Sequence, residues 1–214
     1  MAVLLLLDLD NTLVDRTAAF RRWAAHWAAG HGGGPDDIDW LIATDNDGYE
    51  PRERFARRIA ERLGLPRSEP VLDELRAGMV AELQLDPRVP RALAAATAAG
   101  WSPVVVTNGT VRQQEAKLRH TGLDRLVTGW VISEGVGVRK PDARIFAHAA
   151  AEAGLPLRGW MIGDHIEYDV GGAAAAGLDT VWLSRGRRWP GELPYRPDRV
   201  ADDCASAITA LLQA

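Results

Sequence analysis

The sequence has one cysteine, Cys204, only two lysines, and no long apolar run. A single cysteine excludes a disulfide within the chain and is typical of proteins from a reducing compartment. The leading apolar run, Val3–Leu7, is far shorter than the ~20 residues that a membrane-spanning helix needs. No basic segment precedes this run, as one would in a secretory signal. We therefore expect a cytoplasmic protein that does not enter a membrane.

The chain also lacks an excess of basic charge. Its net charge is −4 and its isoelectric point is near 5.7, which argues against a surface that binds a phosphate backbone. The arginines stand beside acids, as in Arg52–Arg54, a pattern typical of solvated helix faces. We therefore expect no nucleic-acid partner, and the sequence carries no feature that indicates an oligomeric state.

What the chain does have is acidic residues directly after an apolar run. Asp8 and Asp10 follow Val3–Leu7, which reads as a fully buried strand. Open α/β sheets bind ligands at the carboxyl ends of their strands. Two like charges this close cost free energy unless a cation lies between them, and Mg²⁺ is the usual choice. The pattern predicts a carboxylate nucleophile beside a carboxyl group that moves a proton. The alternative is a strand end followed by an acidic turn.

A second short run, Val104–Val106, ends in Thr107, Asn108 and Gly109. A hydroxyl and successive backbone N–H groups at a strand end, with a helix after them, form a phosphate cradle. The same residue types also serve as ordinary turn and helix-cap residues.

Lys140 and two later aspartates complete the candidate residues. Lys140 precedes Pro141, which is expected to open a helix, and is one of two lysines against 23 arginines. A compact ammonium reaches both a phosphoryl oxygen and a carboxylate, although a lysine is usually a solvated surface residue. Trp160–Ile162 reads as a strand that ends before Asp164, and Asp169 follows at an expected helix start, where a carboxylate suits the helix dipole.

Taken in order from Asp8 to Asp169, these segments resemble the four motifs of the haloacid dehalogenase superfamily, which is dominated by Mg²⁺-dependent phosphatases. The resemblance spans nearly the whole chain. It implies that Asp8 is the nucleophile that forms an aspartyl-phosphate. It implies that Asp10 is the general acid and base, which protonates the leaving group and later activates water.

The resemblance also implies how phosphate is held. Thr107, with the backbone of Asn108 and Gly109, would bind the phosphoryl oxygens. Lys140 would brace both Asp8 and the phosphate.

For the metal, the resemblance implies one Mg²⁺ cofactor. Asp8, Asp164 and the backbone carbonyl of Asp10 would be its ligands, with Asp169 as a direct or outer ligand.

The order of predicted elements indicates an α/β fold, a Rossmann-like parallel sheet with helices on both faces. Residues 15–85 show helical periodicity without a convincing strand, and Thr17 is placed to cap the first helix. This block resembles the superfamily's helical cap. We therefore expect a core domain of residues 1–14 and 86–214 and a cap domain of residues 15–85, with a core strand at Leu126–Ile132.

The cap is expected to select the substrate, because the core motifs contact only phosphate. Arg16 follows the first motif, and the loop with Asp45, Asp47 and Tyr49 either reaches the substrate or is a plain turn. Three tryptophans at helical spacing form the core of this domain or line an apolar pocket: Trp23, Trp27 and Trp40.

The function expected from this resemblance is Mg²⁺-dependent hydrolysis of a phosphate monoester of a small phosphorylated metabolite. Haloacid dehalogenation is disfavoured because it needs neither Asp10 nor Asp164. Phosphonate cleavage would need a cap lysine for a Schiff base, and residues 15–84 contain none. A sugar-phosphate mutase on the same core, and a catalytically silent binding protein on this fold, remain as alternatives.

Overall fold

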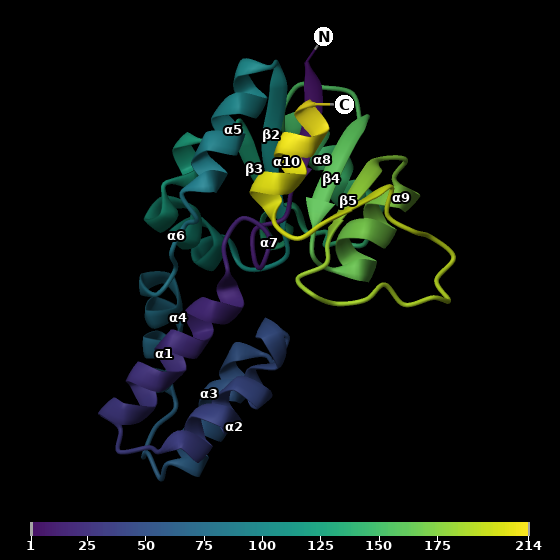
Figure 1. Cartoon of the computed structure of the whole chain (residues 1–214). Helices are drawn as coiled ribbons and strands as arrows, with labels where there is room; N and C mark the ends of the chain where they lie inside the picture. Colours follow the sequence, from purple (N-terminus) through teal and green to yellow (C-terminus); the bar gives the residue numbers. More distant parts are fainter. Residues whose placement is uncertain (1, 214) are drawn as a thin grey trace. The chain divides into compact units, whose positions relative to one another are not determined.

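The computed structural model describes residues 2–213. The chain divides into two compact units, with the boundaries after Val14 and after Gln84. The unit formed by the two ends of the chain contains a parallel sheet, and the unit between them is helical (Figure 1). The strands of the sheet are β1 (Val3–Leu7), β2 (Trp101–Thr107), β3 (Gly129–Ile132), β4 (Gly159–Gly163), β5 (Asp179–Leu183) and β6 (Arg199–Ala201).

The strand order is β3-β2-β1-β4-β5-β6, and all neighbouring pairs are parallel. Strand β1 pairs with β2 and β4 at its two edges, and helices cover both faces of the sheet. This explains why its four leucines, Leu4–Leu7, form one continuous apolar run and are all buried. Successive strands extend first to one side of β1 and then to the other. The reversal places the ligand-binding crevice of such sheets at the carboxyl ends of β1 and β4.

Helices cover both faces of the sheet. Helices α5 and α10 pack against one another and against the sheet on one face, while α8 packs on the other (Figure 1). Because side chains alternate along a strand, Leu4 and Leu6 join Ile145 and Phe146 of α8 in one apolar cluster. The helices and helical turns of this unit are α5 (Arg88–Ala98), α6 (Val111–Thr121), η2 (Leu123–Arg125), α7 (Ser133–Val136), α8 (Ala143–Glu152), η3 (Ile166–Gly171), α9 (Gly172–Ala175) and α10 (Cys204–Leu212).

The other unit is a bundle whose core is aromatic. Trp23 and Trp27 stack with ring centroids 5.5 Å apart, and both are buried. A Cβ atom on Gly78 would lie 2.2 Å from Trp23 Cδ1, so a glycine there lets the indole approach the facing helix. Of the two interpretations of the tryptophans, Trp23 and Trp27 therefore fit the first, because both belong to the core of this unit. The elements of this unit are α1 (Arg16–Gly30), α2 (Pro35–Asp45), η1 (Asn46–Gly48), α3 (Arg52–Arg62) and α4 (Glu69–Ala81).

The predicted α/β class, with a parallel sheet, helices on both faces and an inserted helical block, is confirmed. Three local expectations were wrong. Asp15, and not Thr17, caps α1, because Asp15 Oδ1 accepts the N–H of Ala18 at 2.9 Å. The strand expected from Leu126 begins at Gly129, because the preceding residues form the turn η2. Pro141 does not open a helix, because α8 begins at Ala143 and Asp142 is its N-cap. In addition, the three-residue edge strand β6 was not expected. Within residues 2–213, no helix has the length and apolar character needed to cross a bilayer.

Candidate active site

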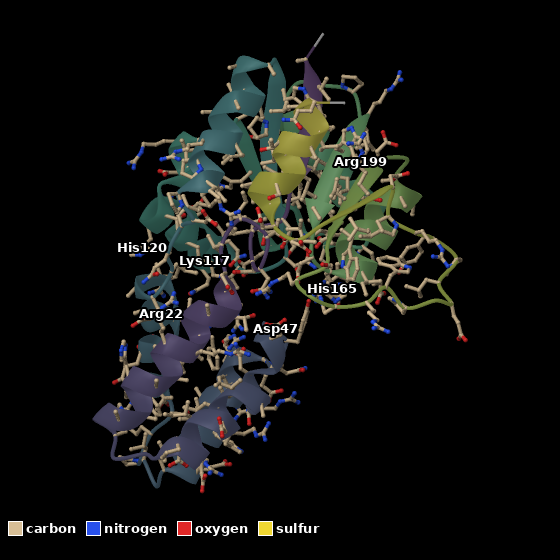
Figure 2. All side chains as sticks on the ribbon, viewed as in Figure 1. Arg22, Asp47, Lys117, His120, His165 and Arg199 are labelled. Carbon is tan, nitrogen blue, oxygen red and sulfur yellow. The ribbon has the colours of Figure 1, made fainter. Side chains whose placement is uncertain are left out.

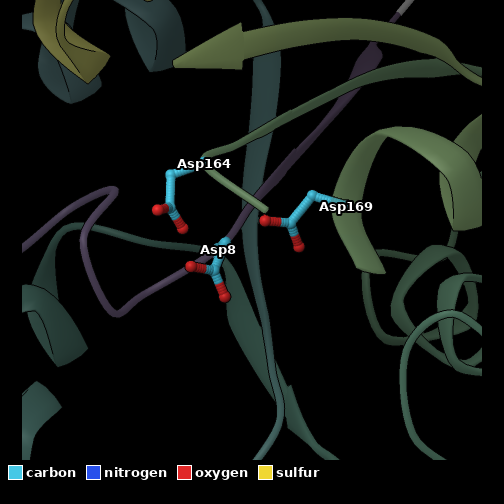
Figure 3. A group of neighbouring side chains, drawn as sticks. All are labelled: Asp8, Asp164 and Asp169. Atoms are coloured by element: carbon cyan, nitrogen blue, oxygen red, sulfur yellow. The ribbon is translucent and has the colours of Figure 1, made fainter. Parts of the chain in front are cut away.

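Three aspartates meet at the carboxyl edge of the sheet. Asp8 follows β1, Asp164 follows β4, and Asp169 lies in η3. One carboxylate oxygen from each lies within 4.8 Å of the others, and all three residues are buried. Figure 3 shows the three side chains turned toward one another. The site thus gathers an all-oxygen set of hard ligands, the kind that Mg²⁺ prefers.

Hydrogen bonds with the backbone position Asp8 and Asp169. The N–H of Asp8 donates to Ile162 O at 3.0 Å, which extends the pairing of β1 with β4 by one residue. Asp169 Oδ2 accepts the N–H of His165 at 2.9 Å. A Cβ atom on Gly163 would lie 2.3 Å from Asp169 Cγ, so glycine before Asp164 allows the close approach of Asp169.

Lys140 is the counter-charge of this cluster. Its side chain is buried, and its Nζ donates to Asp8 Oδ1 and Asp169 Oδ1, both at 2.6 Å, and to Val106 O at 2.8 Å. Burial opposes the charge, but the carboxylates of Asp169 and Asp8 outweigh it and raise the pKa of Lys140 above its usual range. The ammonium is therefore held ionised in the middle of the site.

Asn108 holds the backbone that carries Lys140. Its Nδ2 donates to Lys140 O at 3.0 Å, and its Oδ1 accepts the N–H of Lys140 at 2.9 Å. This two-way bond ties the end of β2 to the segment before α8. The side chain of Asn108 thus acts on Lys140 and not on a ligand.

The cations beside these three carboxylates do not offset their burial and mutual repulsion. Burial raises the pKa of Asp8 to about 7, with a further rise from the repulsion of Asp169, although the charge of Lys140 acts in the opposite direction. Burial and the charges of Asp8 and Asp169 raise the pKa of Asp164 to about 8. These groups hold protons near neutral pH unless a cation offsets their charges.

Asp10 lies beside the cluster and is held from α6. Lys117 Nζ donates to Asp10 Oδ2 at 2.6 Å and to Oδ1 at 2.8 Å, and Gln114 Nε2 donates to Oδ2 at 3.1 Å. The same Gln114 nitrogen donates to Thr107 Oγ1 at 2.6 Å. Of the proposed cradle atoms, the N–H of Gly109 already donates to Ser133 Oγ at 3.0 Å.

Sequence reasoning missed Lys117, Gln114 and Arg187 as site residues. Arg187 Nη2 donates to Asp164 O at 2.6 Å and to its Oδ2 at 3.2 Å, from the segment that follows β5. The one available signal was the scarcity of lysine, since both lysines of the chain contact carboxylates at this edge. His165 orients the loop after β4, because its Nδ1 accepts the N–H groups of Glu167 and Tyr168.

Contacts within the helical unit hold three of its four candidate residues, Arg16, Asp45 and Asp47. Asp45, 1% exposed, accepts from Arg16 and Arg52, each at 2.7 Å. Burial opposes ionisation of Asp45, but these two guanidinium groups outweigh it and lower its pKa. Asp47 Oδ1 accepts from the Thr17 hydroxyl at 2.6 Å. Tyr49, at 50% exposure, is the candidate here whose ring is open to solvent.

Comparison with known proteins shows which families and proteins this chain resembles. The family model of the haloacid dehalogenase-like hydrolases matches residues 3–177. A phosphoserine phosphatase from Thermus thermophilus is 36% identical over 154 residues, which are 71% of this chain and 61% of that protein. A phosphoglycolate phosphatase from Agrobacterium fabrum is 30% identical over 222 residues, covering 100% of this chain and 94% of that protein.

A solved L-2-haloacid dehalogenase has the same fold, with a TM-score of 0.78 at 20% identity over the full length of both chains. At that identity the likeness concerns the fold alone. The Thermus match covers less than two thirds of that relative's own length.

Proposed function

We propose that this chain, which belongs to the haloacid dehalogenase-like hydrolase family, hydrolyses phosphate monoesters of small metabolites through an aspartyl-phosphate. The observation that carries the proposal is that Asp8, Lys140 and the other two buried carboxylates meet beside Asp10 at one sheet edge. Both sequence relatives reported above are named as phosphatases of small metabolites, which supports the substrate class.

The first step transfers the phosphoryl group to the enzyme. A carboxylate oxygen of Asp8 bonds to phosphorus while the bond between phosphorus and the ester oxygen breaks. The ester oxygen takes a proton from the carboxyl group of Asp10 and leaves as an alcohol. Lys140 and the hydroxyl of Thr107 bind phosphoryl oxygens and orient the group.

The second step regenerates the enzyme. Asp10, now a carboxylate, takes a proton from water, whose oxygen bonds to the phosphorus of the aspartyl-phosphate. The bond between phosphorus and Asp8 breaks, and inorganic phosphate and the free carboxylate result. Halide release would need no proton donor, so Asp10 has a use in ester hydrolysis that it lacks in dehalogenation.

The residues of the site fit a Mg²⁺ ion. Its donors would be Asp8, Asp164 and Asp169, with the carbonyl of Asp10 as the family resemblance implies. The fit is supported by the all-oxygen donor set and by the raised pKa values of Asp8 and Asp164, which indicate uncompensated negative charge. When bound, the cation supplies positive charge that offsets the phosphoryl oxygens and the carboxylates.

We assign the helical unit, residues 15–85, the role of a cap that selects the substrate, with Tyr49 as its first candidate contact because of its exposure. Arg16 and Asp45 satisfy one another within that unit, so they enter the proposal as supports of the loop that carries Asp47 and Tyr49. The cytoplasm is the proposed compartment, on the basis of the single cysteine.

The test is phosphate release from p-nitrophenyl phosphate and a panel of phosphorylated metabolites. We expect turnover with Mg²⁺, none in excess EDTA, and recovery when Mg²⁺ is restored. Release of halide from 2-haloacids without phosphate release from any ester would overturn the proposal.

A further inference from the structure

Two buried polar side chains on α6 face the first and second motifs. Gln114 and Lys117 are three residues apart, which places them on the same face of the helix. Their exposed fractions are 2% and 6%, although both side chains are polar. Figure 2 labels Lys117 on this helix. Buried polar groups of this kind need partners, and here the partners are Asp10 and Thr107.

We propose that Lys117 and Gln114 are positioning residues that fix the proton-transferring carboxyl of Asp10 and the hydroxyl of Thr107 relative to the nucleophile. The inference rests on the proposed function. Lys117 Nζ contacts both oxygens of Asp10, at 2.6 and 2.8 Å. A contact to both oxygens restricts rotation of the carboxyl group, where a contact to one oxygen would leave it free to turn.

Gln114 joins the two catalytic groups through one nitrogen. The amide nitrogen of Gln114, and not its oxygen, faces Asp10, so Asp10 Oδ2 is the acceptor of this contact. The same nitrogen then donates to Thr107 Oγ1, so that hydroxyl is an acceptor toward Gln114. The hydrogen of the Thr107 hydroxyl is left to donate elsewhere, which is the orientation that a phosphoryl oxygen requires.

The second motif makes room for this device. A Cβ atom on Gly109 would lie 2.9 Å from Gln114 Cγ and 3.0 Å from its Cδ. Gly109 also has a φ of +154°, which few other residues adopt. Glycine at position 109 therefore leaves the space that the Gln114 side chain occupies when it contacts Asp10.

The choice of residue type supports a specific role for Lys117. The chain uses arginine 23 times and lysine twice, and both lysines lie against carboxylates of this site. A compact ammonium fits a buried position where the larger guanidinium fork needs more space. A surface charge would follow the general preference for arginine.

The test separates positioning of Asp10 from general damage by varying the leaving group. The variant is Lys117→Met, which keeps the side-chain length and removes the ammonium. The matched control is Arg119→Met, on the same helix, where Arg119 pairs with Glu115 in an exposed contact. The substrates are glycerol phosphate, whose alkoxide must be protonated, and p-nitrophenyl phosphate, whose phenolate leaves without a proton.

For Lys117→Met we expect kcat/KM for glycerol phosphate to fall about 10–100-fold, part of the usual contribution of a general acid. We expect kcat/KM for p-nitrophenyl phosphate to stay within about threefold, because its first step needs no acid. Its kcat should fall, with a burst of p-nitrophenolate, because water attack on the aspartyl-phosphate still needs Asp10. Arg119→Met should match the wild type on both esters.

An equal fall in kcat/KM for both esters, or a Lys117→Met enzyme that behaves like Arg119→Met, overturns the positioning role. If Lys117→Met does not fold by circular dichroism, Gln114→Met takes its place. That variant should lower kcat/KM for both esters through Thr107, but should lower it further for glycerol phosphate through Asp10, and it is this difference that is then tested. If neither variant folds, both residues are structural and the inference is also overturned. A wild-type protein that releases phosphate from neither ester refutes the proposed function instead.

Discussion

The two units of the chain bury carboxylates in opposite ways. In the sheet unit, Asp8 and Asp169 share the buried ammonium of Lys140, and Asp164 pairs with the partly exposed Arg187. Burial with mutual repulsion nevertheless raises the pKa of Asp8 and Asp164. In the helical unit, a single buried aspartate has two arginines, and its pKa is lowered.

This difference indicates what each cluster is for. A buried acid with enough cations is satisfied by the protein itself, so its contacts hold the fold together. Buried acids in excess of cations raise the free energy of the folded state unless a ligand supplies charge, and such groups gather at functional sites. The direction of the pKa shift, rather than burial alone, therefore separates the candidate active site from the ion pairs of the helical unit.

The same substitution in both units should have opposite effects on activity and stability. Asp8→Asn should lower turnover of every ester by about 10⁴-fold or more, as expected for loss of a nucleophile. Its melting temperature should stay or rise, because one of the repelling charges is gone. Steady-state phosphate release and thermal unfolding measure the two effects. Activity near the wild-type level would contradict the role of Asp8.

Asp45→Asn should do the reverse and act on stability. Removal of one partner of a buried ion pair typically costs about 3–5 kcal/mol in the free energy of unfolding, because the arginines are left without their acceptor. Glu53→Gln, in the exposed pair with Arg76, is the control and should cost less than about 1 kcal/mol. Urea unfolding at neutral pH gives both values.

The sign of the pH dependence follows from the lowered pKa of Asp45. Its ionised form stabilises the fold at pH values above the unfolded-state pKa of about 4. This stability is lost as the pH falls below that value and through the lower pKa of the folded state. The wild type should therefore lose its advantage over Asp45→Asn in acid. A constant difference across this range would show that the pair does not act through charge.

Metal addition tests whether the three-aspartate cluster binds a cation. Mg²⁺ at about 100 times its dissociation constant should add about 2.7 kcal/mol to the free energy of unfolding, because it binds the folded state. Asp8→Asn should reduce this gain, whereas Glu53→Gln should keep it. Calorimetry with and without Mg²⁺ measures the shift. An equal gain in both variants would place the metal outside the three-aspartate cluster.

The smallest expected effect concerns substrate choice. Tyr49→Ala removes a half-exposed ring from the loop of the helical unit. We expect a change of about threefold to tenfold in the ratio of kcat/KM values among metabolite esters, since one lost contact is worth about 1 kcal/mol. p-Nitrophenyl phosphate should change least. An unchanged ratio would remove Tyr49 from the candidate substrate contacts.

Sequence reasoning worked best where chemistry directly follows a strand. The apolar run of β1 and the acids after it fix both the element and the edge at which Asp8 lies, because parallel strands end together. The same logic applied to Thr107 and Asp164. These predictions needed only local pattern and one rule of topology.

The remainder depended on packing between distant elements. Arg16 and Asp45 are 29 residues apart, and Lys117 and Asp10 are 107 apart, so no local pattern joins them. The edge strand β6 has three residues and too short a pattern to detect. Leu126 lies outside β3 because it ends the turn η2, although the stretch around it is apolar. Tertiary contacts decided the two side-chain pairings, and a local turn decided where β3 begins.

The scarcity of lysine also means that chemical labelling of lysine reports on this site. Apart from the amino terminus, reagents that acylate primary amines have two targets in this chain, Lys117 and Lys140, and both are buried. Labelling therefore requires a local opening of the site, and its rate measures how often the site opens. Peptide mass spectrometry would assign each label, and a phosphate analogue that holds the site closed would slow both reactions. The motions of this site can thus be followed in the unaltered chain.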